Sequence, residues 1–382
     1  MAGIYIHIPF CKQACSYCDF YFLTKGELKQ PFVDSLIEEI HHYGSHPISD
    51  ETIDTIYIGG GTPSLLTPKQ LRSIFTALEK VFTVKPVEVT LEMNPDDVTE
   101  EFLLKIQDLG VDRASMGVQS FDEKLLQFMH RAHDPIEAVD ALKLLQKANF
   151  PSYTADLIYG NPGQTMEMLE KDIDRLLTFD PPHISAYSLT IEPKTRLGKQ
   201  VELGRIDPVD DEVVADQFDF LYQKLSSAGV EQYEVSNFAK PGKEAVHNSN
   251  YWRHKNYLGL GPSAHSLYWP DADNAQRWKN RSNLKSYLEQ NWDDVREDEE
   301  SLSLSEMAEE RLMLGLRTKW GVSKKQLKEW YGYILNKEQK EWLKKQREEG
   351  QFTSVDDEII LSKTGLRIAD YLIFELISRQ EM

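Results

Sequence analysis

The stretch IYIHIPFCKQACSYC, residues 4–18, joins a strand pattern to all three cysteines of the chain. Its first five residues are mostly β-branched or aromatic and predict a short strand. Cys11, Cys15 and Cys18 follow with the spacing C-x3-C-x2-C on the loop after that strand. An odd number of cysteines in one short segment cannot form a disulfide framework, so these thiols indicate metal chemistry in a reducing compartment.

Three thiolates this close in sequence can wrap one small inorganic centre without help from distant parts of the fold. Iron–sulfur clusters normally take four cysteine ligands, so three leave one iron with open coordination. A cofactor with adjacent amine and carboxylate groups can chelate that iron. Two other interpretations stay open, namely a zinc site completed by a histidine such as His7, and three unligated thiols. Because zinc sites favour paired C-x2-C knuckles, the spacing favours a [4Fe–4S] cluster on Cys11, Cys15 and Cys18.

Alternating strand and helix patterns extend outward from this stretch. The predicted strands are residues 4–8, 55–58, 87–91, 114–118, 153–159, 184–189 and 233–235. The predicted helices lie near residues 31–43, 67–78, 101–109, 134–142, 166–177 and 213–228. Short links between these elements favour parallel strands in right-handed βαβ units. We therefore expect an α/β fold with a partial (β/α)6 barrel, and an open doubly wound sheet is the alternative.

The pattern changes twice towards the C-terminus. A stretch rich in Gly, Asn, His and aromatic residues begins near residue 240, and capping boxes at Ser303 and Ser323 predict helices further on. A helix near 337–347 and a hairpin within 351–361 complete a pattern that resembles a winged helix. Acidic and basic residues balance there, which favours a packing or partner role over nucleic-acid binding. The predicted parts are a barrel domain at 1–238, a connecting region at 239–300 and a mainly helical, winged-helix-like domain at 301–382.

Composition limits the partners that we expect. The chain has 382 residues, with 62 Asp and Glu against 43 Lys and Arg, a formal charge of -19. Such a surface repels phosphate backbones, so nucleic acid is not an expected partner. No apolar run approaches the roughly 20 residues that cross a bilayer, and the first residues lack the basic flank of a secretory signal. These features predict a cytoplasmic protein, and a peripheral position at a membrane stays open.

Two motifs together carry a family resemblance. The cysteine spacing after one strand and GGGTPS at residues 59–64 after the next resemble the radical S-adenosylmethionine (SAM) superfamily. YIHIPFC at residues 5–11 is similar to the HemN/HemW group within it, which contains oxygen-independent coproporphyrinogen III oxidases and their heme-binding relatives. The resemblance covers nearly the whole chain. It implies a radical SAM barrel that holds a [4Fe–4S] cluster and SAM.

Polar residues at the predicted strand ends fit a cofactor pocket, because chemistry in parallel α/β folds collects at those ends. Glycines at 59–61 let the backbone approach a ligand closely, while the Lys-Ser/Thr of a phosphate loop is missing. Carboxylates suit ribose hydroxyls and a sulfonium, and an arginine suits a carboxylate. Each residue taken singly also fits a helix cap or a loop ion pair. By resemblance, the residues that hold SAM are Tyr5, Tyr17, Gly60, Gly61, Thr62, Glu92, Gln119, Arg131 and Asp156.

Two departures separate this sequence from the oxidase pattern. Oxidases of the group have a further cysteine in C-x3-C-x2-C-x-C, where this sequence has Phe20. They also carry an N-terminal extension that lines the substrate site, whereas here Tyr5 follows almost at once. Both departures favour the heme-chaperone branch, which delivers heme to an acceptor such as a respiratory membrane protein. The alternatives are a coproporphyrinogen III oxidase of porphyrin biosynthesis and, more remotely, a radical enzyme that modifies RNA or protein.

HNSNYW at residues 247–252 matches the H-N-x-x-Y-W element of that branch and implies heme contacts by His247, Tyr251 and Trp252. Imidazole is a common heme-iron ligand, and flat aromatic rings can lie against a porphyrin face. The other interpretation is that His247 caps a turn while the two aromatic residues pack in the core. His254 and His265 are weaker candidates as ligands.

Overall fold

One large sheet runs through the first 303 residues of the computed structural model, which describes residues 1–270 and 274–380. Within these residues the sheet has 12 strands in the order β12-β11-β10-β9-β1-β2-β3-β4-β5-β6-β8-β7. Its central strands are β1 Ala2–Ile8, β2 Thr52–Gly60, β3 Thr83–Met93, β4 Arg113–Gln119, β5 Ser152–Tyr159 and β6 His183–Ser188.

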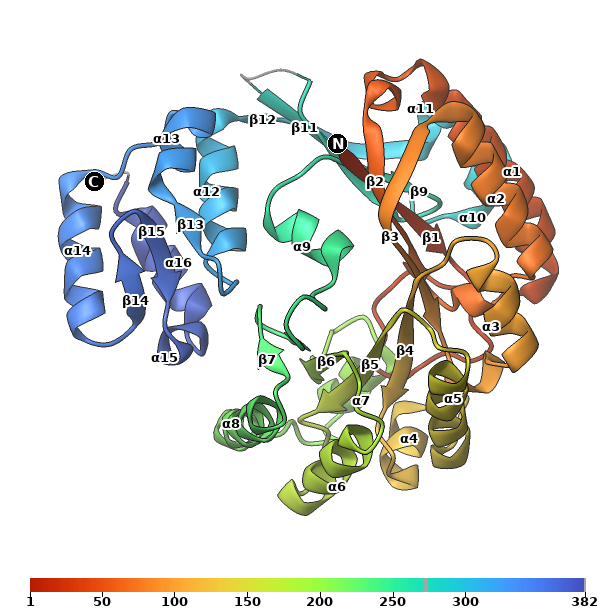
Figure 1. Cartoon of the computed structure of the whole chain (residues 1–382), viewed down its shortest axis with the longest axis horizontal. Coiled ribbons are helices and arrows are strands. Elements are labelled where there is room, and N and C mark those ends of the chain that lie inside the picture. The colour runs from red at the N-terminus through yellow and green to blue at the C-terminus, as the bar shows by residue number, and fades with distance from the viewer. Residues whose placement is uncertain (271–273, 381–382) are drawn as a thin grey trace.

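Strands β1 to β6 are parallel and lie side by side in chain order. A doubly wound sheet reverses its strand order in the middle, so the singly wound barrel topology is the correct alternative. The α/β prediction is confirmed. Figure 1 shows the connecting helices on the outer face of the sheet. They are α1 Lys29–His42, α2 Pro68–Val81, α3 Glu100–Gln107, α4 Glu123–Met129, α5 Pro135–Lys147 and α6 Met166–Leu177.

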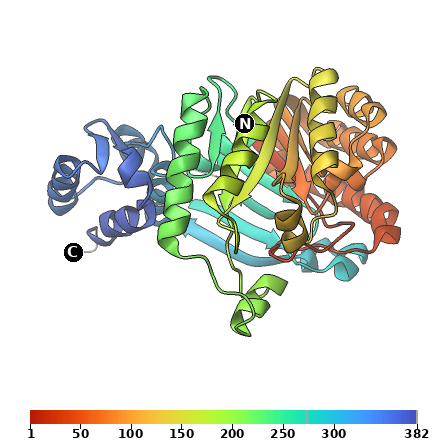
Figure 2. The same ribbon diagram turned by 90° about the horizontal axis from the view of Figure 1, so that it is seen from below.

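The barrel is open, because the two edge strands of the parallel set pair with other strands. The free edge of β1 pairs with β9 Tyr257–Leu260, and β6 pairs antiparallel with β8 Asn237–Ala239. The sheet therefore continues past residue 238 into the predicted connecting region. Figure 2 shows how these later strands extend from the barrel towards the C-terminal domain. These strands are β9, β10 His265–Tyr268, β11 Asn274–Asn280 and β12 Arg296–Ser303. The helices of this part of the chain are α7 Arg196–Glu202, α8 Asp211–Ser227, α9 Val246–Trp252, α10 Leu284–Leu288 and α11 Trp292–Val295.

Helix starts follow the capping residues of the sequence. Thr67 with Gln70 forms a reciprocal capping box, as does Ser303 with Glu306. Each satisfies two backbone N–H groups that a helix start leaves unpaired. The box predicted at Ser323 forms only in part, because its side chain accepts the bond from the third residue of the helix and no return bond is made.

The strand predicted at residues 233–235 is wrong. These residues form the turn between β7 Glu231–Gln232 and β8, and Tyr233 N donates to Asn237 O at 3.0 Å. The Tyr233 hydroxyl bonds His183 at 2.8 Å, and its ring lies 5.9 Å from the Trp320 ring between centroids. The aromatic and β-branched residues that imitated a strand here serve tertiary packing instead.

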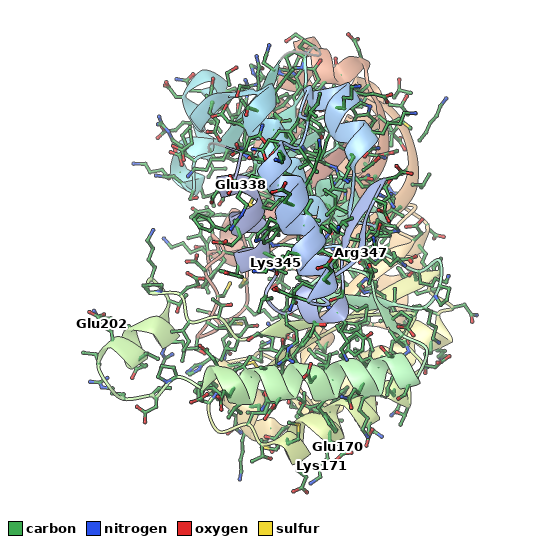
Figure 3. The ribbon with its side chains drawn as sticks, turned by 90° about the vertical axis from the view of Figure 1, so that its left-hand side faces the viewer. Glu170, Lys171, Glu202, Glu338, Lys345 and Arg347 are labelled. Atoms are coloured by element: carbon green, nitrogen blue, oxygen red, sulfur yellow. The ribbon has the colours of Figure 1, made fainter. Side chains whose placement is uncertain are left out.

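The C-terminal domain has a separate apolar core, built around residues such as Leu312 and Leu372. The hairpin predicted within 351–361 is confirmed, with a third short strand beside it. Figure 3 shows Glu338, Lys345 and Arg347 projecting from α14, so acids and bases mix along that helix. The elements are α12 Leu304–Gly315, β13 Val322–Ser323, α13 Lys324–Tyr331, α14 Lys337–Glu348, β14 Phe352–Val355, β15 Glu358–Leu361, α15 Lys363–Leu366 and α16 Ala369–Ser378.

A buried carboxylate joins α1 to the later strands. Glu39 is 2% exposed and accepts bonds from the Tyr287 hydroxyl at 2.6 Å, Asn280 Nδ2 at 2.6 Å and Gly261 N at 2.8 Å. These donors favour the ionised form, but burial outweighs them and raises the pKa of Glu39 to about 7.

The raised pKa of Glu39 predicts a pH dependence of stability. The folded chain binds this proton more tightly than the unfolded chain, so the carboxyl favours folding most below pH 4.5. Relative to Glu39→Gln, the wild type should therefore lose up to about 3 kcal/mol of unfolding free energy as the pH rises from 4.5 to about 7. Urea unfolding of both proteins at a series of pH values measures this difference. A difference that does not change with pH would contradict the assignment.

Candidate cluster and cofactor site

The cysteine loop begins where β1 ends and is fixed to the fold through its backbone. Cys11 N donates to Leu23 O at 2.9 Å, and Ser16 N donates to Met129 O at 3.0 Å. The loop therefore lies between the segment that leads to α1 and the end of α4. The three thiols, all partly exposed, are free.

The environment of the thiols disfavours isolated thiolates. Burial raises the pKa of Cys11 to about 12 and that of Cys18 to about 11. A centre that binds thiolates has to displace these protons, and a positively charged iron–sulfur core does so. Among the described residues, no group of three or more His, Cys, Asp or Glu side chains is arranged to hold a single metal ion.

His7 on β1 makes two hydrogen bonds with its ring, and they decide whether it is available as a zinc ligand. His7 Nε2 lies 2.8 Å from Tyr21 O, and because a carbonyl only accepts, this nitrogen carries the proton. His7 Nδ1 then accepts from the Tyr5 hydroxyl at 3.1 Å. Both ring nitrogens are thus hydrogen-bonded within the fold, so His7 could complete a zinc site only if Nδ1 lost its bond from Tyr5.

The glycine loop after β2 lies against the cysteine loop at van der Waals distance. Gly61 N donates to Ile8 O at 2.8 Å, and Thr62 N donates to Phe10 O at 2.7 Å. A Cβ atom at Gly61 would lie 2.6 Å from Phe10 O and 3.0 Å from Cys11 Sγ. Only glycine allows this approach, which the sequence predicted from the triple glycine.

Glu92 is the last residue but one of β3 and connects the glycine loop to the barrel interior. Its carboxylate accepts from Gly60 N at 3.0 Å and from the Tyr57 hydroxyl at 2.7 Å. Burial, opposed by these bonds, raises the pKa of Glu92 to about 7. Asp156 on β5 has a pKa raised to about 6 for the same reason and accepts from Ser115 Oγ at 3.4 Å.

Arg131 is the centre of the polar part of the site. Its Nη1 lies 3.5 Å from Cys15 Sγ and 3.4 Å from the Tyr17 hydroxyl, and its Nη2 donates to Asn94 Oδ1 at 2.6 Å and to Gly117 O at 3.0 Å. The predicted residues Tyr17 and Arg131 are therefore brought together with Cys15.

Two buried polar atoms beside Arg131 lack partners. Arg131 Nε and Gln119 Oε1 have no hydrogen-bond partner among the described residues. Both side chains approach Gly117, where a Cβ would meet Arg131 Nη2 and Gln119 Nε2 at 3.0 Å each. Gln119 also has a φ of 66°, an uncommon backbone conformation for a residue with a side chain. An unpaired donor and an unpaired acceptor on two side chains that meet at Gly117 match a ligand that has both a carboxylate and an ammonium group.

The donor set therefore fits both implied cofactors. Three free thiols on one short loop suit the cluster, and the unpaired atoms at residues 119 and 131 suit the amino-acid end of SAM. The carboxylate of Glu92 lies near the end of β3, and that of Asp156 lies within β5, on the far side of β4; both can accept from hydroxyl groups.

His247 lies inside the barrel rather than at its surface. It is 1% exposed, its Nδ1 lies 2.9 Å from Thr55 Oγ1, and its Nε2 lies 2.8 Å from the Tyr251 hydroxyl. Burial lowers its pKa to about 3, so the imidazole is neutral. Glu88 accepts from the backbone N–H groups of Val246 and His247 at 2.8 Å each, which anchors the start of α9.

The other heme candidates differ in access. Tyr251 and Trp252 are partly exposed on α9. His254 is buried and bonds Glu310 at 3.1 Å, whereas His265 is exposed and its side chain has no hydrogen bond among the described residues. Phe20, in the position of the oxidases' further cysteine, is 69% exposed.

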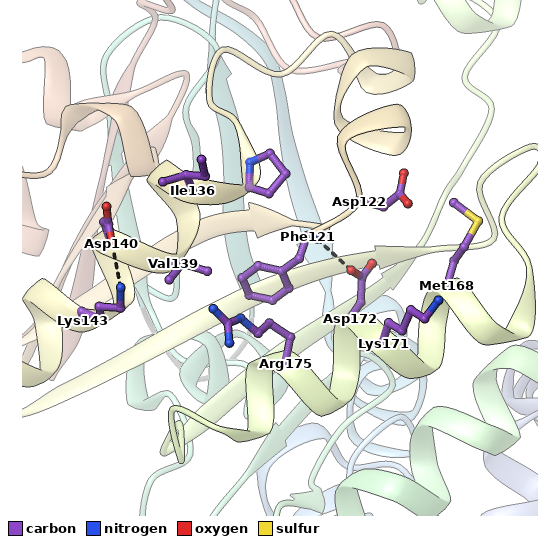
Figure 4. Close-up of a pocket in the computed structure, with 11 residues that line it drawn as sticks. Phe121, Asp122, Ile136, Val139, Asp140, Lys143, Met168, Lys171, Asp172 and Arg175 are labelled. Atoms are coloured by element: carbon purple, nitrogen blue, oxygen red, sulfur yellow. Dashed lines mark hydrogen bonds and ion pairs between the residues drawn. The ribbon is translucent and has the colours of Figure 1, made fainter.

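A groove of about 570 Å³ lies away from the cysteines, between α5 and α6 on the outer face of the barrel. Figure 4 shows Phe121 at its centre, with Lys143 and Arg175 on one side and Lys171 on the other. It contains none of the predicted site residues.

Sequence reasoning missed several residues that shape the site. Tyr57, Asn94 and Gly117 each contact a predicted residue directly. Asn94 lies two residues after Glu92, and Gly117 lies two residues before Gln119. Their closeness to predicted site residues near strand ends was the sequence signal that could have identified them.

Comparison with known proteins agrees with this geometry. The family model described as Radical SAM superfamily matches residues 5–176. The structure of coproporphyrinogen III oxidase (HemN) from Escherichia coli superimposes with a TM-score of 0.81 at 21% identity, covering 99% of this chain and 89% of that chain. This likeness shows the fold. Fold and site together thus define a radical SAM protein.

Relatives of known function show to which family of radical SAM proteins the chain belongs. Heme chaperone HemW of Lactococcus lactis is 38% identical over 320 residues, which cover 83% of this chain and 82% of that protein. HemW of Bacillus subtilis is 34% identical over 96% of each chain, and HemW of Escherichia coli is 38% identical over 70% of this chain and 71% of its own. The chain belongs to the HemW family of heme chaperones.

Proposed function

We propose that this chain binds heme and passes it to an acceptor protein, on a scaffold that carries one [4Fe–4S] cluster and SAM. The observation that carries the proposal is the 38% identity to a heme chaperone over 82% of that protein. The exposed Phe20 supports the choice against the oxidase, because it offers no thiol where the oxidases have one.

The site geometry supports the cofactor residues that we propose. Cys11, Cys15 and Cys18 hold the cluster, which when bound can supply one electron to the sulfonium of SAM. The residues proposed to bind SAM are Tyr5, Tyr17, Gly60, Gly61, Thr62, Glu92, Gln119, Arg131 and Asp156. In this arrangement the glycine loop brings backbone N–H groups close to the ligand, and the buried carboxylates accept from its hydroxyl groups.

The proposed heme ligand His247 needs a change of conformation. Its two hydrogen bonds, to Thr55 and Tyr251, occupy both ring nitrogens. Iron can bind only a nitrogen whose lone pair is available, so one of these bonds has to break. Movement of α9 as a whole separates His247 from Thr55 and frees Nδ1, whereas the bond to Tyr251 lies within α9 and breaks only if one of these two side chains turns.

A heme titration of the reconstituted protein tests the proposal. We expect one heme per chain, followed by the Soret band, and at least a tenfold weaker affinity for His247→Ala because the iron loses its imidazole. His254→Ala is the matched control, since this buried histidine also has two hydrogen bonds, to Glu310 and Tyr331. His265→Ala tests the exposed alternative.

Each outcome has a distinct meaning. Equal losses of heme affinity in the His247 and His254 variants indicate damage to the fold. A loss of heme affinity confined to His265→Ala indicates that the iron ligand is His265 on β10. Wild-type protein that binds no heme contradicts the chaperone proposal. Conversion of coproporphyrinogen III to protoporphyrinogen by the loaded protein supports the oxidase instead.

A further inference from the structure

Asn94 joins two sides of the cluster site through one side-chain amide. Its Oδ1 accepts from Arg131 Nη2 at 2.6 Å, while its Nδ2 donates to Thr62 Oγ1 at 3.1 Å. Asn94 directly follows β3 and begins the turn Pro95–Asp97. One residue therefore contacts both the glycine loop and the central arginine.

Both partners of Asn94 contact the cysteine loop. Arg131 Nη1 lies 3.5 Å from Cys15 Sγ, and the backbone N–H of Thr62 donates at 2.7 Å to the carbonyl of Phe10, which directly precedes Cys11. Asn94 thus lies in the middle of a chain of contacts that runs from the start of the loop through Thr62 and Arg131 to Cys15. No other described side chain is hydrogen-bonded to both Thr62 and Arg131.

Neighbouring residues fix the backbone of Asn94, and with it the position of its side chain. Asn94 N lies 3.4 Å from Ser64 Oγ, and Ser64 Oγ donates to Asp97 Oδ2 at 2.9 Å. Asp97 also forms an ion pair with Lys12 of the cysteine loop, and Asp96 does so at 2.7 Å. Asn94 is therefore fixed to the same loop whose thiols it influences.

The bond from Asn94 also determines which donor of Arg131 remains for a ligand. The guanidinium is planar with a fixed fork of donors, so fixing Nη2 fixes the direction of Nε. Nη1 and Nη2 are both occupied, and Nε is the one nitrogen of this side chain that is buried without a partner.

We propose that Asn94 is a positioning residue that orients Arg131 so that Nη1 faces the cluster cysteine and Nε faces the carboxylate of SAM. Asn94 does not touch the ligand itself. The inference rests on the cluster and SAM part of the proposed function and is independent of where heme binds.

Two substitutions separate the two bonds of the amide. Asn94→Ala removes both, so Arg131 loses its orientation, and we expect SAM to bind at least tenfold more weakly to the cluster-loaded protein. Asn94→Asp keeps an oxygen for Arg131 but loses the donor to Thr62, so we expect SAM affinity within threefold of wild type. Calorimetric titration with SAM measures affinity, and the change that SAM causes in the EPR spectrum of the reduced cluster reports its position at the iron.

Asn336→Ala is the matched control. Asn336 also uses one oxygen and one NH2 group, since it caps α14 through Gln339 N at 2.8 Å and donates to Arg379 O at 2.6 Å. It lies in the C-terminal domain, so its loss lowers stability without touching the site. We expect iron content, SAM affinity and the EPR change to match those of wild type.

The outcomes are separable from failure of the proposed function. Wild-type protein that holds a cluster but binds no SAM removes the cofactor assignment itself. If wild type binds SAM and Asn94→Ala binds it within twofold with the same EPR change, the inference is overturned. Equal losses in Asn94→Ala and Asn336→Ala, or loss of iron from both Asn94 variants, also overturn it, because the effect is then on stability or cluster loading.

Discussion

Replacement of Cys15 by alanine should abolish the iron–sulfur centre. Two thiolates cannot hold a [4Fe–4S] cube that already has one iron without a protein ligand. We expect iron and sulfide after anaerobic reconstitution to fall from four of each per chain to background, with loss of the cluster's Mössbauer signal. The fold should remain, since Cys15 is only partly buried and its thiol is hydrogen-bonded to Arg131 alone among the described residues.

Ala14→Ser provides the control for this experiment. Ala14 is exposed in the same loop, so the change alters the loop's composition but none of its ligands. It should retain full iron and sulfide. An intact cube in Cys15→Ala, or a single zinc ion per chain in the wild type, would remove the basis of the cluster assignment.

Replacement of Gly61 by alanine should be nearly as damaging although it removes no ligand. The added Cβ would meet Phe10 O at 2.6 Å and Ile8 O at 2.9 Å, both backbone atoms that cannot turn away. The glycine and cysteine loops then have to separate, which costs about 2 kcal/mol of unfolding free energy and displaces Cys11. We expect a lower thermal midpoint and loss of most cluster iron.

Gly26→Ala separates this steric effect from a general effect of the substitution. A Cβ at Gly26 meets only Lys29 Cε, at 3.8 Å, which is ordinary contact. Its stability and iron content should match those of the wild type. Full cluster loading in Gly61→Ala would show that the two loops are less tightly apposed than the structure indicates.

The barrel was predictable because its signals are local. Capping boxes at Thr67 and Asp134 mark helix starts, and β-branched runs mark buried strands. The turn at residues 233–235 was mispredicted because its composition is that of a strand while its tyrosine packs against residues far along the chain. Pairing of β1 with β9 has no local signal, since the two strands lie about 250 residues apart.

The site was predictable to the extent that chemistry is visible in residue type. Cysteines, a triple glycine and carboxylates near strand ends can be recognised in the sequence by residue type. The structure brings the predicted SAM and cluster residues between positions 5 and 156 to one end of the barrel. Asn94 escaped because an asparagine after a strand is common in turns, and only its two bonds reveal a further use. The burial of His247 escaped because sequence does not show which face of α9 points inward.

The pairing of β1 with a strand on each edge affects how the chain folds during synthesis. Strand β1 leaves the ribosome first, and β2 can join it soon afterwards, but β9 follows only at Tyr257–Leu260. Until then the nascent chain carries its cysteine loop on a strand with one unpaired edge, and long-range pairing of this kind forms slowly. A chain that stops short of β9 would therefore expose that edge to aggregation.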